Sequence, residues 1–123
     1  MDIRSIMIVD DSEPDQFLAE SVIQKFDPSV KILQAYDGQE ALEKLDAMEI
    51  QPSLILLDIN MPRMNGFEFL EEYNKREGRA VVIAMLTSSD QNQDKLKAAN
   101  FGCVQEYFIK PLQVKYLEDI SKI

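Results

Sequence analysis

Acidic side chains follow two apolar segments that have the character of buried strands. Asp58 comes directly after the run 54–57, and Asp10-Asp11 come directly after the segment 3–9. Carboxylates that converge on one site repel each other, so bound protons or a hard cation must offset the repulsion. An all-oxygen set with no histidine or cysteine favours magnesium over zinc. These residue types and positions therefore suggest a magnesium site.

A simpler interpretation applies to some of these residues and stays open from the sequence alone. Asp11 or Ser12 could do no more than cap the helix that follows the first strand. Thr87 follows the fourth apolar segment, and its hydroxyl could bond a phosphoryl oxygen. Lys110 follows the fifth and could pair with Asp58 and with a phosphate placed beside it. Taken singly, each of these side chains is an ordinary loop residue.

Strand-like and helix-like segments alternate five times along the chain. We therefore expect an α/β fold, a flavodoxin-like doubly wound parallel sheet of five strands with five helices. With strand order 2-1-3-4-5, the crevice for a ligand lies between the first and third strands, beyond Asp10-Asp11 and Asp58. The expected strands span 3–9, 30–35, 54–57, 81–86 and 104–109. The expected helices run from Ser12 to about Phe26, from Glu40 to Met48, from Phe67 to near Gly78, through Leu96 to an end at Gly102, and from Leu112 to Ile123.

Composition excludes several classes of function. With 123 residues the chain is expected to form one domain, and its net charge of -9 argues against direct nucleic-acid binding. The chain contains no histidine, so it cannot donate a phosphoryl group from one. It has one cysteine, no secretory leader pattern and no apolar run of about 20 residues. We therefore expect a cytoplasmic protein that neither spans nor binds a membrane.

The complete set of residues resembles the receiver domain of two-component response regulators. The resemblance covers essentially the whole chain and rests on order and spacing rather than on any single motif. It implies a stand-alone receiver over residues 1–123 with no output domain, of the chemotaxis or phosphorelay type. The matching features are Asp10-Asp11, Asp37-Gly38 before Glu40-Ala41-Leu42, Asp58-x-x-Met61-Pro62-x-Met64-x-Gly66, Thr87, Tyr107 and Lys110-Pro111.

The resemblance also implies a role for each site residue. Asp58 would accept a phosphoryl group from a phosphohistidine on a sensor histidine kinase or a histidine phosphotransfer protein. Asp10, Asp11, Asp58 and the backbone carbonyl of Asn60 would hold Mg²⁺. Lys110 would contact a phosphoryl oxygen, and its bond to the following proline would be cis. The protein would be a signalling phosphoacceptor rather than an enzyme.

A switch is the second implication of the resemblance. Thr87 would move to bond the phosphoryl group, and Tyr107 would turn inward to fill the vacated space. The fourth helix, fifth strand and fifth helix would then present the signal to a downstream protein. The oligomeric state expected for such a receiver is a monomer or a weak homodimer.

Three rival functions share parts of this pattern. A flavin or nucleotide binder of the same fold needs a Gly/Ser/Thr-rich loop after the first strand, but residues 10–13 are Asp-Asp-Ser-Glu. A magnesium-dependent phosphohydrolase would need a second acid near Asp58 as general acid, and Asn60 does not titrate. The third rival is a protein-interaction module that works without phosphorylation. The residue set argues against this module without excluding it.

Overall fold

The fold is a five-stranded parallel sheet enclosed by helices. The computed structural model describes residues 1–76 and 81–123 of the chain, and strands and helices alternate throughout. The strands are β1 (Ser5–Val9), β2 (Lys31–Ala35), β3 (Leu54–Leu57), β4 (Val82–Thr87) and β5 (Val104–Ile109). The helices are α1 (Glu13–Phe26), α2 (Gly38–Ala47), α3 (Gly66–Asn74), α4 (Asn92–Ala99) and α5 (Val114–Ser121).

The strand order is β2-β1-β3-β4-β5 and every neighbouring pair is parallel, which confirms the expected topology. The β1–β3 register pairs Val9 with Leu57. The next residues along the two strands are Asp10 and Asp58, so this register alone places the two acids side by side. The switch point of the sheet is therefore lined with carboxylates.

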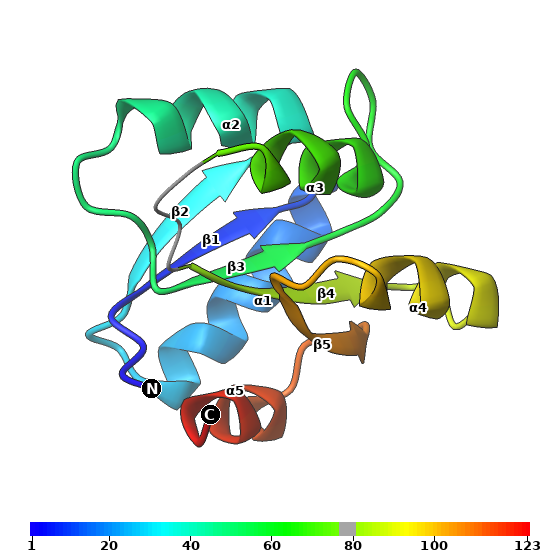
Figure 1. Cartoon of the computed structure of the whole chain (residues 1–123). Helices are drawn as coiled ribbons and strands as arrows, with labels where there is room; N and C mark the ends of the chain where they lie inside the picture. The colour runs from blue at the N-terminus through cyan, green and yellow to red at the C-terminus, as the bar shows by residue number, and fades with distance from the viewer. Residues whose placement is uncertain (77–80) are drawn as a thin grey trace.

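Two hydrophobic layers cover the faces of the sheet. In Figure 1, α2 and α3 lie over one face, and α1 and α5 lie over the other. Alternate residues of β3 enter the two layers: Ile55 packs with the α2, α3 and α4 side, and Leu56 packs with the α1 and α5 side. All four residues of β3 are buried, as expected for a central parallel strand. Asp58 thus extends from the most enclosed strand of the sheet.

Capping side chains mark the start of α1, α2 and α3. The Ser12 hydroxyl accepts a hydrogen bond from the Asp15 N–H and caps α1, as predicted. Asn65 forms a reciprocal capping box with Glu68 and starts α3. Asp37 caps α2 by accepting from the Glu40 N–H, so this helix begins at residue 38, before the predicted start.

Some expectations about the helices were wrong. Although α1 spans the expected range, its Phe17 and Leu18 side chains are 68% and 53% exposed. The buried face of α1 is instead formed by Gln16, Ala19 and Ile23. Likewise α4 ends at Ala99 with Asn100 as its C-cap, before the predicted stop at Gly102. The predicted end of the third helix near Gly78 lies outside the described residues.

Candidate functional site

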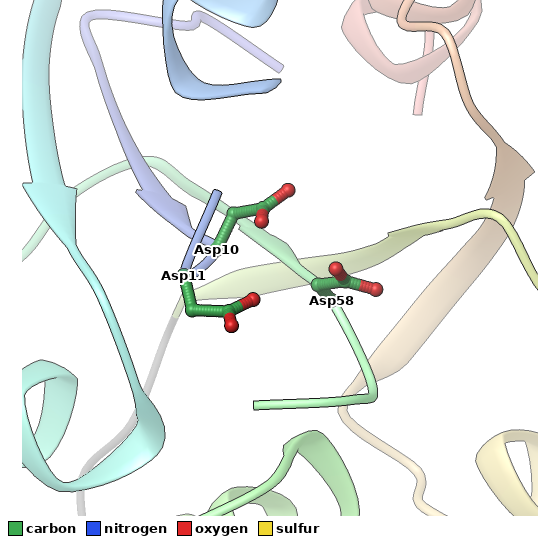
Figure 2. A group of neighbouring side chains, drawn as sticks. All are labelled: Asp10, Asp11 and Asp58. Carbon is green, nitrogen blue, oxygen red and sulfur yellow. The ribbon is translucent and has the colours of Figure 1, made fainter. Parts of the chain in front are cut away.

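Three aspartates meet at the C-terminal ends of β1 and β3. Oxygen atoms of Asp10, Asp11 and Asp58 all lie within 4.8 Å of one another, and Figure 2 shows the three side chains side by side. Their backbones are tied to the sheet, since the Asp58 N–H donates to Val9 O and the Asp10 N–H donates to Ala35 O, both at 3.0 Å. Asp10 and Asp58 are buried, whereas Asp11 is exposed. The sheet thus presents a preformed carboxylate cluster with one face open to solvent.

Lys110 enters this cluster from β5 with its ammonium nitrogen among carboxylates. Nζ lies 2.9 Å from Asp58 Oδ2, 2.7 Å from Asp10 Oδ2 and 2.7 Å from Asp15 Oδ2. Burial acts to lower the pKa of Lys110, but these hydrogen bonds outweigh burial and raise it well above its usual value. Burial raises the pKa of Asp10 despite its hydrogen bond with Lys110. The predicted pairing of Lys110 with Asp58 is therefore confirmed.

The loop after Asp58 folds back tightly onto the residue that carries the acid. The Gly66 N–H donates to Ile59 O at 2.8 Å, which closes the loop of residues 59–66. A Cβ at Gly66 would lie 2.3 Å from Asp58 O, so only glycine fits at this position. The side chain is fixed as well, because the Ile59 N–H donates to Asp58 Oδ1 at 2.7 Å.

Thr87 and Tyr107 are connected through a single intermediate residue. Thr87 is fully buried at the end of β4, and its Oγ1 accepts a hydrogen bond from the Ser89 N–H at 3.3 Å. The half-buried Tyr107 donates its hydroxyl proton to Ser89 O at 2.8 Å. Burial raises the pKa of the Tyr107 hydroxyl. The two predicted switch residues thus contact the same short segment after β4.

The remaining predicted residues fall at this same edge of the sheet. Asn60 is exposed and belongs to the loop that begins at Asp58. The Lys110–Pro111 peptide bond is cis, as expected. The Lys110 N–H donates to Thr87 O at 2.8 Å, which joins the ends of β4 and β5. Because Ser12 takes the capping role, the alternative interpretation of Asp11 as the cap of α1 does not hold.

Two site residues on α1 were not predicted. Asp15 is one of the three acids that contact Lys110, and Gln16 is almost fully buried beneath the cluster. The Gln16 amide nitrogen lies 3.0 Å from the carbonyl oxygens of Ile8, Asp10 and Ala35. Gln16 therefore ties the ends of β1 and β2 together and positions the backbone of Asp10. The sequence could have indicated both residues, because they lie near the start of the helix that follows Asp10-Asp11.

The donor set fits a divalent cation. Among the described residues, Lys110 contacts three carboxylates, those of Asp10, Asp15 and Asp58, and Asp11 adds a fourth carboxylate beside Asp10 and Asp58. The excess negative charge calls for a further cation. Asp10, Asp11 and Asp58 can together bind a divalent metal through oxygen atoms, the ligands that hard cations prefer. Cys103 directly precedes β5, so it lies at the N-terminal ends of the strands, whereas this cluster lies at their C-terminal ends.

Comparison with protein families assigns the chain to a known class. Residues 6–122 match the response regulator receiver domain, so the chain belongs to this family. Receiver domains are signalling phosphoacceptors of two-component systems rather than enzymes that turn over a substrate, and histidine kinases are their partners in those systems. The resemblance inferred from the acids, the threonine and the lysine is thereby confirmed.

Solved structures of receivers superpose closely on this fold. A two-component response regulator from Cytophaga hutchinsonii is 28% identical with a TM-score of 0.89, and 99% of this chain and 96% of that chain are covered. The phosphorylated cyanobacterial phytochrome response regulator RcpA is 25% identical with a TM-score of 0.81, covering 98% and 90%. The Mn²⁺-bound form of response regulator Rcp1 is 26% identical with a TM-score of 0.78, covering 95% and 88%.

Curated relatives carry this domain within longer proteins. The sensor histidine kinase CheAY of Helicobacter pylori is 30% identical over 120 residues, which are 95% of this chain and 14% of that protein. Protein-glutamate methylesterase/protein-glutamine glutaminase 1 of Methanospirillum hungatei is 33% identical over 122 residues, which are 94% of this chain and 33% of that protein. The chain therefore spans well under half the length of these relatives.

Within its described residues, none of the helices has the length and apolar character needed to cross a bilayer.

Proposed function

We propose that this receiver accepts a phosphoryl group on Asp58 from a phosphohistidine of a partner protein. In the transfer, a carboxylate oxygen of Asp58 forms a bond to phosphorus as the P–N bond breaks, and the electron pair leaves with the imidazole nitrogen. The observation that carries the proposal is the position of Asp58, a buried carboxylate between Lys110 and the acids at the end of β1. These 123 residues contain no histidine, so the donor imidazole would lie outside them, on a sensor histidine kinase or a histidine phosphotransfer protein.

Mg²⁺ is the cofactor that we assign to the acidic cluster. Asp10, Asp11, Asp58 and the backbone carbonyl of Asn60 would hold it. The bound cation would neutralise charge on the phosphoryl oxygens during transfer. The ammonium of Lys110, already directed at Asp58, would contact a further phosphoryl oxygen. The protein groups therefore act by positioning and by charge, with no need for a general acid.

The output would be a change at the surface formed by α4, β5 and α5. Thr87 would bond the phosphoryl group through its hydroxyl, which changes the segment that carries Ser89. Tyr107 would follow, because its hydroxyl donates to the Ser89 carbonyl. This short connection supports a two-state switch that phosphorylation biases. The receiver would act in the cytoplasm, as a monomer or weak homodimer, on a downstream protein rather than on nucleic acid.

Intact-mass analysis after incubation with acetyl phosphate and Mg²⁺ tests this function. The wild-type protein is expected to gain one phosphoryl group that is lost slowly in buffer, as an acyl phosphate is. Asp58→Asn should gain none. Asp46→Asn is the matched control, since Asp46 is exposed and pairs with Arg76 away from the cluster. A wild-type protein that gains no phosphate would favour the phosphorylation-independent interaction module, and labelled Asp58→Asn would refute the choice of acceptor.

A further inference from the structure

Asp15 makes a contact that the proposed chemistry does not use. Its Oδ2 lies 2.7 Å from the ammonium of Lys110, as close as Asp10 and closer than Asp58. An ammonium has three N–H donors, and here three carboxylates accept from it. The donors of Lys110 are therefore fully engaged. A phosphoryl oxygen can bond Lys110 only when one of the three carboxylates gives way.

Burial decides which of the three carboxylates gives way most easily. The Asp10 and Asp58 side chains are 4% and 10% exposed, so in the protein without bound metal, separating either from Lys110 would leave a buried charge without its counter-ion. The Asp15 side chain is 37% exposed and can exchange the ammonium for water. A pocket of about 50 Å³ borders Asp15 and Lys110, and it has room for a water molecule beside the pair.

The position of Asp15 on α1 lowers the cost of this exchange further. Asp15 lies in the first turn of the helix, where the exposed N–H groups favour a negative charge. Its own N–H is held by the Ser12 hydroxyl, so the backbone does not depend on the contact with Lys110. Asp15 can thus release Lys110 without disturbing the helix.

We propose that Asp15 is the exchangeable partner of Lys110, a positioning residue that holds the ammonium in the unmodified protein and gives up its place to a phosphoryl oxygen. This inference rests on the proposed phosphorylation of Asp58. It follows that Asp15 competes with the phosphoryl group for Lys110. The competition slows phosphorylation and shortens the life of the product, since the same carboxylate can reclaim the ammonium.

Three variants test the competition by labelling with acetyl phosphate and Mg²⁺. Asp15→Asn keeps the size and removes the charge, and we expect labelling about 1.5 to five times faster, the range expected for a partly exposed ion pair. The phosphorylated form should also persist longer. Asp15→Glu restores the carboxylate and should return both quantities toward the wild-type values. Glu13→Gln removes an equal charge from the same helical turn without a contact to Lys110 among the described residues, and should leave both unchanged.

A spectroscopic readout separates competition from a structural effect. The ¹⁵N resonance of the Lys110 ammonium should shift on Asp15→Asn in the unmodified protein and should not shift in the phosphorylated protein, where Asp15 has already released it. A shift of equal size in both states would overturn the inference, as would labelling of Asp15→Asn that is no faster than wild type. If Glu13→Gln were labelled as fast as Asp15→Asn, the change in net charge alone would explain the faster labelling, and the inference would be overturned. If wild-type protein gains no phosphate, the proposed function itself fails.

Discussion

Arg63 binds both carboxylate oxygens of Asp37, with Nε 2.8 Å from Oδ2 and Nη2 3.1 Å from Oδ1. This pair connects the loop before α2 to the loop that follows Asp58. A backbone hydrogen bond from the Gly38 N–H to Met64 O lies alongside it at 2.9 Å. Arg63 has a φ of 60°, a left-handed conformation that an arginine rarely adopts without such constraints. The loop of residues 59–66, called the acceptor loop below, is therefore anchored to Asp37, a residue far from Asp58 in the sequence.

Substitutions of Asp37 and Arg63 should distinguish two roles of Asp37, as the N-cap of α2 and as the partner of Arg63. Asp37→Ala removes the N-cap of α2 and the partner of Arg63, and we expect unfolding to become easier by about 1 kcal/mol from the cap alone. Arg63→Ala leaves the cap intact and should lower the urea midpoint by less. Urea unfolding followed by circular dichroism measures both. Equal midpoints for the two variants would contradict a separate capping role for Asp37.

The charge of Asp37 should make stability depend on pH in acid. Burial acts to raise the pKa of Asp37, but hydrogen bonds from Arg63 and the Glu40 N–H outweigh burial and lower it. A lowered pKa in the folded state means that the carboxylate stabilises the fold above its unfolded pKa of about 3.9. That stabilisation is lost as pH falls through the folded-state value. Asp37→Asn keeps a capping side chain, so its difference in unfolding free energy from wild type should shrink in this acid range.

Gly66 should not tolerate a side chain. Gly66→Ala would place a methyl group 2.3 Å from Asp58 O, and the backbone would have to shift to relieve the contact. We expect a loss of about 1–3 kcal/mol in the free energy of unfolding, together with slower phosphorylation of Asp58. Gly102→Ala is the control, because a Cβ there meets nothing within 4 Å. Equal stability of the two variants would contradict the close packing of the acceptor loop.

Magnesium should stabilise the folded protein through the three aspartates. A ligand that binds the folded state alone, at about ten times its dissociation constant, adds about 1.4 kcal/mol. Thermal unfolding in MgCl₂ and in EDTA measures this difference. Asp11→Asn should abolish it, since Asp11 belongs to the cluster and leaves the capping of α1 untouched. Asp2→Asn should retain it, because Asp2 is exposed and pairs with Arg4 at the N-terminal end of β1.

Thr87 should be needed for the response and not for the transfer. Thr87→Ala removes the hydroxyl that the Ser89 N–H contacts, while Asp58 and Lys110 keep their geometry. We therefore expect Thr87→Ala to gain phosphate and to lose the phosphorylation-dependent NMR shifts of Ser89 and Tyr107. Thr87→Ser keeps a hydroxyl and should retain these shifts. Full shifts in Thr87→Ala would rule out Thr87 as the link.

The location of the site followed from simple features of the sequence. The apolar run 54–57 favours a central strand, which the structure confirms, and parallel strands bring their C-terminal ends to one edge of the sheet. Asp10, Asp58 and Lys110 each follow such a strand directly. Their convergence was therefore predictable from strand ends and topology, before any contact was known.

The role of α1 was not predictable in the same way, because the residues of α1 that meet the site are polar. Phe17 and Leu18 are exposed, while Gln16 is buried because its amide bonds three strand carbonyls. A polar side chain that satisfies buried backbone groups is not visible in a hydrophobic pattern. The rotation of the helix about its axis also decides that Asp15 reaches Lys110. This rotation depends on tertiary packing.

The five-stranded order has a consequence for how the protein is made. The acids at the end of β1 and Asp58 are synthesised before Lys110, because Lys110 follows β5, the last of the five strands in chain order. A nascent chain that stops short of β5 displays the carboxylates without their counter-ion. The acids at the ends of β1 and β3 therefore gain their positive partner only when β5 joins the sheet.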